Sequence, residues 1–146
     1  MLFRSLDVTI QAQILDLMKD LSHKFDTSIL LITHDLGVVS EVADRVVVMY
    51  CGQVVEEASV DDLFEEPLHP YTNGLMGSIP DIEGDISRLQ SIDGNVPPPT
   101  NLPQGCRFAP RCPKAFDRCH SEIPELLKRS GNRSVRCFLY EGEEAK

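Results

Sequence analysis

The sequence has no apolar run long enough to cross a bilayer and no pattern typical of a secretion signal. A membrane-spanning helix needs about 20 mostly apolar residues, and no stretch of this 146-residue chain approaches that length. The first ten residues, MLFRSLDVTI, carry one positive charge and reach Asp7 too early for the apolar core of a signal peptide. We therefore expect a cytoplasmic protein.

Positive charge is also scarce. The chain has 14 Lys and Arg against 23 Asp and Glu, which gives a formal net charge of −9. Proteins that bind a phosphate backbone present a basic face, so the composition argues against nucleic acid as a partner. The charge is uneven: residues 56–66 are strongly acidic, whereas residues 107–118 hold four cations against one acid (Arg107, Arg111, Lys114 and Arg118).

Close cysteine pairs of the CxxC type are absent, although the chain contains five cysteines. Structural zinc sites usually use such pairs, and disulfides are rare in cytosolic proteins. Four cysteines follow a wider spacing, C-x5-C-x6-C-x17-C: Cys106, Cys112, Cys119 and Cys137. An iron–sulfur cluster is wider than one ion and accepts wider loops. The spacing favours such a cluster, with zinc, or disulfides and free thiols, as alternatives; the surrounding cations would offset its negative charge.

Apolar periodicity predicts two helices and a buried strand near the amino terminus. Apolar residues at steps of three and four predict a helix over residues 8–24, with Asp7 at the N-cap position. The run SILLIT, residues 28–33, is typical of a strand buried on both faces in a parallel sheet. Such a strand needs neighbours on both sides, which this chain does not obviously supply. HDLGVVSEVA then predicts a second helix.

A hairpin and two short helices are predicted next. RVVVMY and QVVEEA flank Cys51 and Gly52 and predict two antiparallel strands, with Cys51 as an uninvolved thiol at the turn. Ser59 is placed to cap a short helix. We interpret His69-Pro70-Tyr71 as a further helix start, with Pro70 at the first position, rather than as a ligand site. Alternating helices and strands indicate an α/β fold class.

Three stretches together carry a family resemblance. LDVTIQAQILDLMKDL, ILLITHDLGVVSEVADRVVVMYCGQVVE and LHPYTNGLMGSIP resemble, in order and spacing, the ATP-binding subunits of bacterial ABC transporters. The last stretch and the cysteine-rich tail resemble the oligopeptide, dipeptide and nickel uptake group. The resemblance implies the C-terminal part of a P-loop-type ABC ATPase domain over residues 1–80. A Pro-rich linker or arm over 81–105 and a metal-binding extension over 106–146 would follow.

The resemblance also implies roles for particular residues. LDV is similar to the D-loop of the family, which implies that Asp7 lies across a dimer interface near the partner's nucleotide. THD is similar to the switch region, which implies that His34 contacts the γ-phosphate of ATP and helps to arrange the attacking water. Some members of the group carry a 4Fe–4S cluster on a matching motif, which adds to the case for the four cysteines as its ligands.

The sequence departs from the family pattern in what it lacks. It has no GxxxxGK[ST] phosphate loop, no LSGGQ-like signature and no apolar strand ending in Asp-Glu. We therefore expect a C-terminal fragment that retains part of the ATP site without hydrolysing ATP. ATP and magnesium would be cofactors of the full-length parent only.

The expected partners follow from the same resemblance. In the full-length parent they are membrane permease subunits and a second ATPase subunit, with the protein on the inner face of the cell membrane. The fragment alone is expected to self-associate through apolar surfaces within residues 8–50. Two alternatives stay open: an independent iron–sulfur or zinc binding interaction module, and a non-functional fragment of a broken gene.

Overall fold

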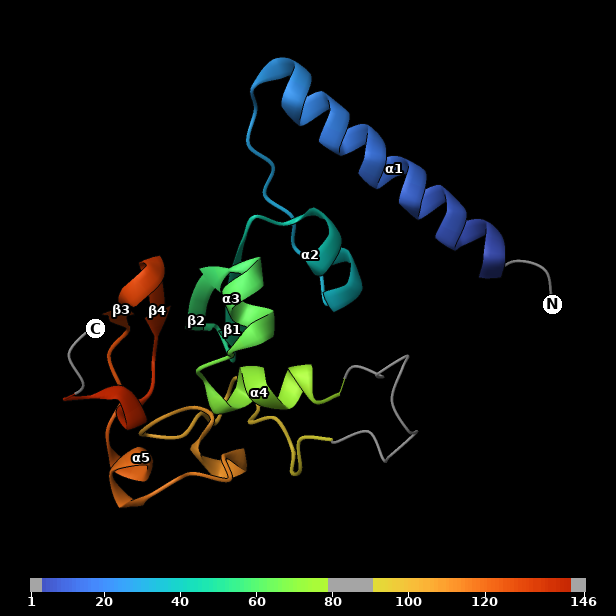
Figure 1. The fold of residues 1–146 in the computed structure, drawn as a ribbon. Helices are drawn as coiled ribbons and strands as arrows, with labels where there is room; N and C mark the ends of the chain where they lie inside the picture. Colours follow the sequence, from blue (N-terminus) through green and yellow to red (C-terminus); the bar gives the residue numbers. More distant parts are fainter. Residues whose placement is uncertain (1–3, 79–90, 143–146) are drawn as a thin grey trace. The chain divides into compact units, whose positions relative to one another are not determined.

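The computed structural model describes residues 4–78 and 91–142, and the side chains from Ile10 onward except Gln11. The chain divides into two compact units, residues 1–43 and 44–146, which are described separately (Figure 1). The domain boundaries expected at residues 80 and 105 stay predictions. Within the described residues, no helix is both long enough and apolar enough to cross a membrane.

The first unit contains two helices, α1 (Arg4–Phe25) and α2 (Leu36–Val42). Both predicted helices are confirmed, but α1 begins at Arg4, so the prediction that Asp7 is the N-cap is wrong. The apolar stripe of α1 is exposed to solvent, with five large side chains at least 43% exposed: Ile10, Ile14, Leu17, Leu21 and Phe25. The stripe that the sequence predicted is therefore present but is not buried by the described residues of this unit.

The predicted strand over residues 28–33 is wrong for this structure. The segment forms no strand, and the side chains of Leu30 and Ile32 are 89% and 90% exposed. A buried strand needs neighbouring strands for its backbone N–H and C=O groups. The described strands form one sheet that lies in the other unit, so the apolar run has no strand to pair with.

The second unit is built on an antiparallel sheet with the strand order β1-β2-β4-β3. The strands are β1 (Arg45–Tyr50), β2 (Gln53–Ser59), β3 (Leu127–Arg129) and β4 (Arg133–Val135). The predicted hairpin is confirmed as β1 and β2. Its two turn residues, Cys51 and Gly52, both have positive φ angles, of 45° and 78°, as a tight two-residue hairpin turn requires.

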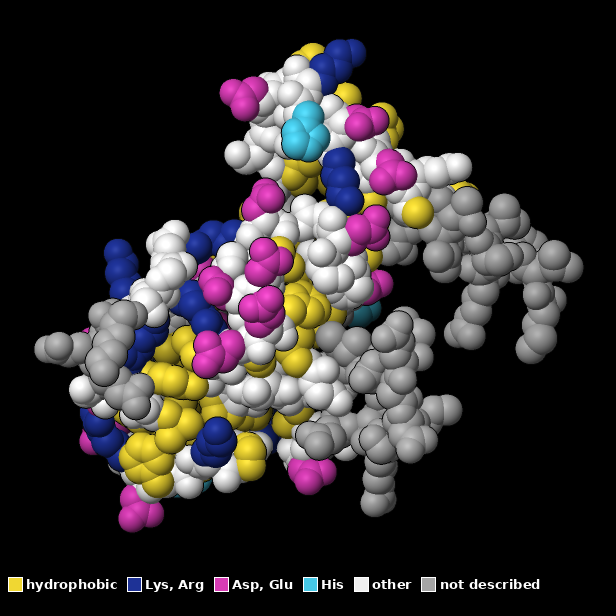
Figure 2. Space-filling model, viewed as in Figure 1, with side chains coloured by type: hydrophobic (Ala, Val, Ile, Leu, Met, Phe, Trp, Pro, Cys, Tyr) yellow, Lys and Arg dark blue, Asp and Glu magenta, His cyan; other side chains and the backbone are white. Residues whose placement is uncertain are grey.

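Three short helices accompany the sheet: α3 (Val60–Glu65), α4 (Pro70–Met76) and α5 (Asp117–Ser121). Ser59 caps α3 by accepting the Asp62 N–H at 3.2 Å, as predicted. Acidic side chains lie at the surface over α3 (Figure 2). His69 caps α4, with Pro70 in its first turn, so the interpretation of this tripeptide as a helix start is confirmed.

The cysteine-rich segment shares its core with the hairpin. Phe108 is 1% exposed and packs in a cluster with Val48, Tyr50, Val55, Ala58 and Leu63. Its ring lies 5.2 Å from that of Tyr50 and 5.5 Å from that of Tyr71, measured between centroids. β4 then pairs with β2. The fold mixes helices with a four-stranded sheet, in agreement with the expected α/β class.

A candidate cysteine centre

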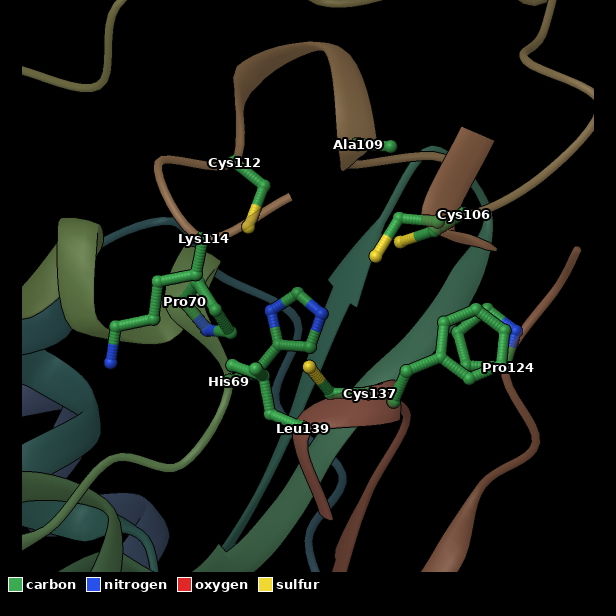
Figure 3. Close-up of a pocket in the computed structure, with 11 residues that line it drawn as sticks. His69, Pro70, Cys106, Ala109, Cys112, Lys114, Pro124, Cys137 and Leu139 are labelled. Atoms are coloured by element: carbon green, nitrogen blue, oxygen red, sulfur yellow. The ribbon is translucent and has the colours of Figure 1, made fainter. Parts of the chain in front are cut away.

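The four spaced cysteines line one cavity in the second unit. Cys106 and Cys112 come from the loop around a 3-10 helix (Ala109–Arg111), Cys119 lies in α5, and Cys137 follows β4. Figure 3 shows the sulfur atoms of Cys106, Cys112 and Cys137 directed toward the same space. Residues that are up to 31 positions apart in sequence (Cys106 and Cys137) therefore meet at one place.

Backbone contacts explain how the loops converge. The Cys106 N–H donates to the Cys119 carbonyl at 2.8 Å. A Cβ atom at Gly105 would lie 2.4 Å from that same carbonyl oxygen and 2.9 Å from the Glu122 carbonyl oxygen. Only glycine allows this approach without displacement of the backbone, because a Cβ atom cannot come so close to backbone oxygen.

The thiols are close enough to affect one another. Burial, with smaller contributions from the neighbouring Cys112, Cys106 and Cys119, raises the pKa of Cys137 to about 11. Burial likewise raises the pKa of Cys106 and of Cys112. Without a bound cation these side chains are neutral thiols at pH 7; a metal would supply the positive charge that favours thiolates.

The donor set around the cavity consists of free cysteine thiols. All five cysteines lie in the described part of the chain, and all are free thiols there. Among the described residues, no three His, Cys, Asp or Glu side chains come close enough to hold a single metal ion. The four thiols that line one cavity are the donor type that iron–sulfur clusters use. Cys51 lies at the hairpin turn and does not line the cavity.

The cations expected to neutralise a cluster are mostly engaged elsewhere. Arg107 donates to the Cys51 carbonyl, and Arg111 donates to the carbonyls of Ile92 and Asp93 at 2.7 and 2.9 Å. Arg118 pairs with the carboxylates of Glu122 and Glu141. The expectation that these three arginines offset the charge of a cluster is therefore not supported by their contacts.

Two other cations, Lys114 and Arg136, influence the thiols. Lys114 lines the cavity, although its chain runs away from the sulfur atoms (Figure 3). Arg136 acts on Cys106, whose pKa its charge lowers against the larger effect of burial. The guanidinium of Arg136 is held by the carbonyls of Val54 and Pro124 at 2.8 and 3.0 Å. In the sequence, the position of Arg136 directly before Cys137 was the feature that could have identified this cation.

His69 is a residue of the site that the sequence interpretation missed. It is 1% exposed, and its ring lines the cavity with the four cysteines (Figure 3). Burial lowers its pKa to about 4, so the imidazole is neutral at pH 7. The helix-start interpretation explained the His-Pro-Tyr tripeptide fully from local rules, and nothing local indicated which way the ring faces.

The predicted nucleotide residues lie in the first unit. His34 is exposed and comes just before α2, whose N-cap is Asp35. The Asp35 carboxylate accepts the Gly37 N–H at 2.9 Å and the Val38 N–H at 3.3 Å. Asp7 lies within α1, and its side chain is outside the described residues. The roles of both residues at a nucleotide stay predictions.

A known protein family matches the central part of the chain. Residues 55–119 match the family described as "Oligopeptide/dipeptide transporter, C-terminal region". This match contains β2 from Val55 onward, the His69 turn and three of the four spaced cysteines; Cys137 lies beyond it.

Individual relatives match over nearly the whole chain. The oligopeptide transport ATP-binding protein AppD of Bacillus subtilis is 70% identical over 97% of this chain and 43% of its own length. The dipeptide transport ATP-binding protein DppD of the same species is 49% identical over 92% of this chain and 40% of its own length. A putative peptide import ATP-binding protein of Brucella abortus is 50% identical over 91% and 40%. The chain thus spans less than half the length of these relatives.

Proposed function

Because the chain belongs with the ATP-binding subunits of oligopeptide and dipeptide ABC transporters, we propose that it forms part of the energy-coupling subunit of a peptide importer. The observation that carries the proposal is 70% identity, over 97% of the chain, to a relative named as an oligopeptide transport ATP-binding protein. The full protein would work on the inner face of the membrane, with permease subunits and a second ATPase subunit as partners.

In this proposal His34 contacts the γ-phosphate of the bound nucleotide. It is an exposed imidazole directly before the capped start of α2. Contact with a γ-phosphate requires an accessible side chain that can donate a hydrogen bond to a phosphoryl oxygen, and the exposure of His34 supports this. Asp7 would face the nucleotide of a partner subunit.

A chimera tests the transport role directly. The region of AppD that aligns with this chain is replaced by the chain, in Bacillus subtilis lacking its own AppD, and uptake of a labelled oligopeptide is measured. Uptake is expected from the chimera and is expected to be lost with His34→Ala. His23→Ala, which changes another exposed histidine of the first unit, should leave it intact. A folded chimera without uptake, or uptake that survives His34→Ala, would contradict the proposal.

We further propose that Cys106, Cys112, Cys119 and Cys137 hold a 4Fe–4S cluster, with a zinc ion as the alternative. The convergence of the four thiols on one cavity supports this. When bound, the metal centre would supply thiolate–metal bonds that tie together the segments carrying these cysteines. The fold positions the thiols. Gly105 permits the close approach of Cys106 to α5, and Cys137 follows the end of β4.

Iron and sulfide analysis of anaerobically purified protein tests the cluster. We expect a brown protein with broad absorbance at about 400 nm, typical of thiolate-bound iron–sulfur centres. Cys112→Ser should bleach it and make residues 106–142 sensitive to protease. Cys51→Ser is the matched control and should do neither, because Cys51 lies outside the cavity. Colourless protein with one zinc per chain would favour the zinc alternative, and a metal-free protein that resists protease would overturn both.

A further inference from the structure

The backbone of Arg136 is fixed to the hairpin at the point where β4 ends. β4 pairs with β2 through Ser134 and Val135, and the Arg136 N–H adds a further hydrogen bond, 2.8 Å long, to the Val55 carbonyl. Cys137 is the next residue in the chain. The contact between Arg136 and β2 therefore sets where the chain reaches the cavity with its fourth thiol.

The side chain of Arg136 makes two more hydrogen bonds, to two different segments. Its Nε–H donates to the Val54 carbonyl of β2 at 2.8 Å, and its Nη1–H donates to the Pro124 carbonyl at 3.0 Å. Pro124 is buried and lines the cavity (Figure 3). It lies three residues beyond the end of α5, the helix that contains Cys119. One guanidinium thus joins the hairpin to the segment that follows Cys119.

These contacts depend on the shape and charge of an arginine side chain. A guanidinium is planar and presents its N–H donors in a rigid fork, whereas a lysine ammonium is a compact point charge. Hydrogen bonds from an ionised donor are roughly twice as strong as those between neutral groups. Loss of the Arg136 guanidinium would therefore release the carbonyls of Val54 and Pro124 and loosen the chain next to Cys137.

We propose that Arg136 is a positioning residue of the cysteine centre, which fixes the chain at Cys137 both to the hairpin and to the cavity wall at Pro124. This inference rests on the metal centre proposed above. Arg136 is not a ligand, because a guanidinium stays protonated and has no acceptor atom. Groups that orient metal ligands from outside the coordination shell typically contribute a factor of about 10 to 100 in metal affinity.

The charge of Arg136 also lies close to the cavity. One hydrogen bond separates the guanidinium from Pro124, a residue of the cavity wall. The net charge around an iron–sulfur cluster affects its reduction potential, and a nearby cation stabilises the reduced state, which is the more negative one. A variant without this charge should therefore have a lower reduction potential, an effect that a loss of packing alone would not cause.

The test is the rate at which an iron chelator removes iron from the anaerobically purified full chain, followed by the absorbance at about 400 nm. Arg136→Met keeps a long side chain but loses the charge and both side-chain hydrogen bonds. We expect iron release about tenfold faster than in the wild type, together with a lower reduction potential. Arg136→Lys keeps the charge but not the fork. It should restore the reduction potential, while its iron release stays faster than that of the wild type.

Arg45→Met is the matched control. The Arg45 guanidinium also joins the hairpin to the C-terminal part of the unit, since it donates to the Glu57 carboxylate and to the Asn132 carbonyl, each at 2.9 Å. None of these three described residues lines the cavity. Asn132 precedes β4, whereas Cys137 follows it, so the control loses a similar link at the other end of the strand. Its iron release and reduction potential should equal those of the wild type.

Loss of iron from Arg136→Met during purification would also support the proposal, if Arg45→Met retains its iron and both variants have the circular dichroism of the wild type. Equal release from Arg136→Met and the wild type would overturn it, as would equal acceleration in Arg136→Met and Arg45→Met. A reduction potential that does not change in Arg136→Met, or that Arg136→Lys does not restore, would count against it as well.

The same experiment separates this proposal from that of the metal centre. A wild type with neither iron nor zinc would overturn the metal centre, and the role of Arg136 with it. Unchanged release from an iron-loaded Arg136→Met would overturn the role of Arg136 alone. If the wild type holds one zinc ion, the release of zinc to a chelating dye replaces the iron measurement, and the same order of rates is expected.

Discussion

The two units of the chain differ in whether their apolar side chains are exposed or buried. In residues 1–43 the stripe of α1 and the run at 28–33 are exposed. Among the described side chains of this unit, Leu15 is the one apolar side chain that is buried. In residues 44–146 the hairpin, α3 and the cysteine-rich segment bury a shared core around Phe108. The difference shows that an apolar pattern can predict a helix such as α1, whereas burial, and for residues 28–33 the formation of a strand, depends on whether a partner for the element is present.

The largest expected contrast comes from one residue type in the two units. Phe108→Ala removes a ring that is 1% exposed and should lower the free energy of unfolding by about 3–5 kcal/mol. Phe25→Ala removes a ring that is 62% exposed and should change it by less than about 0.5 kcal/mol. Urea unfolding followed by tyrosine fluorescence measures the first variant, because the chain has no tryptophan and its three tyrosines all lie after residue 44. Circular dichroism, to which the helix α1 contributes, measures the second. Similar losses for the two variants would contradict the contrast between the units.

Substitution of one glycine in each unit tests the same comparison, with smaller expected changes in the free energy of unfolding. Gly105→Ala places a Cβ atom against backbone oxygens of α5 and the residue after it, which cannot move as a side chain can, and should destabilise the second unit by about 1–3 kcal/mol. Gly37→Ala meets only a carboxylate oxygen of Asp35, at 3.2 Å, inside a helix that alanine favours. It should have little effect. Thermal unfolding by circular dichroism distinguishes the two; a neutral Gly105→Ala would mean that the loop at Cys106 rearranges freely.

Local sequence rules predicted β1, β2, α3 and α4 of the second unit, but did not predict β3, β4 or α5. The β1–β2 hairpin follows from two apolar runs around a glycine turn, and the starts of α3 and α4 follow from Ser59 and Pro70. The strand at residues 28–33 failed because pairing is not a local property: the run is apolar enough, but the described residues offer it no neighbour. Asp7 failed as an N-cap because good helix-forming residues precede it.

The four cysteines that line the cavity were predictable from the sequence, whereas the residues around them were not. Cysteine spacing was enough to select the four residues that line the cavity. The neighbouring charges were not predictable, because Arg107, Arg111 and Arg118 found closer acceptors in carbonyls and carboxylates. His69 was missed since its role as a helix cap already accounted for the motif, and only the tertiary packing turns its ring toward the thiols.

The exposed stripe of α1 predicts self-association of the chain. Leu17 is 57% exposed in the middle of the stripe, and Leu17→Lys places a charge where a second copy would bury apolar surface. We expect about a tenfold weaker dimer, the effect of roughly 1.4 kcal/mol. Ala12→Lys adds the same charge on the opposite side of the helix and should change little. Sedimentation equilibrium at micromolar concentration gives both constants; a wild type that is strictly monomeric would contradict the prediction.

The smallest expected effect is in ATP turnover by the chain alone. Hydrolysis needs a loop that cradles the phosphates, a residue that holds magnesium and a residue that polarises water, and the sequence lacks the motifs that supply them. His34 is exposed and ready for contact, but one contact to a terminal phosphate cannot replace the missing groups. The chain should therefore release phosphate from ATP no faster than buffer, and His34→Ala should leave both this rate and the stability unchanged. A coupled phosphate assay at millimolar ATP measures the rate, with the chimera described above as the positive control. Turnover above the blank that disappears with His34→Ala would show that the first unit carries more of the nucleotide site than its sequence indicates.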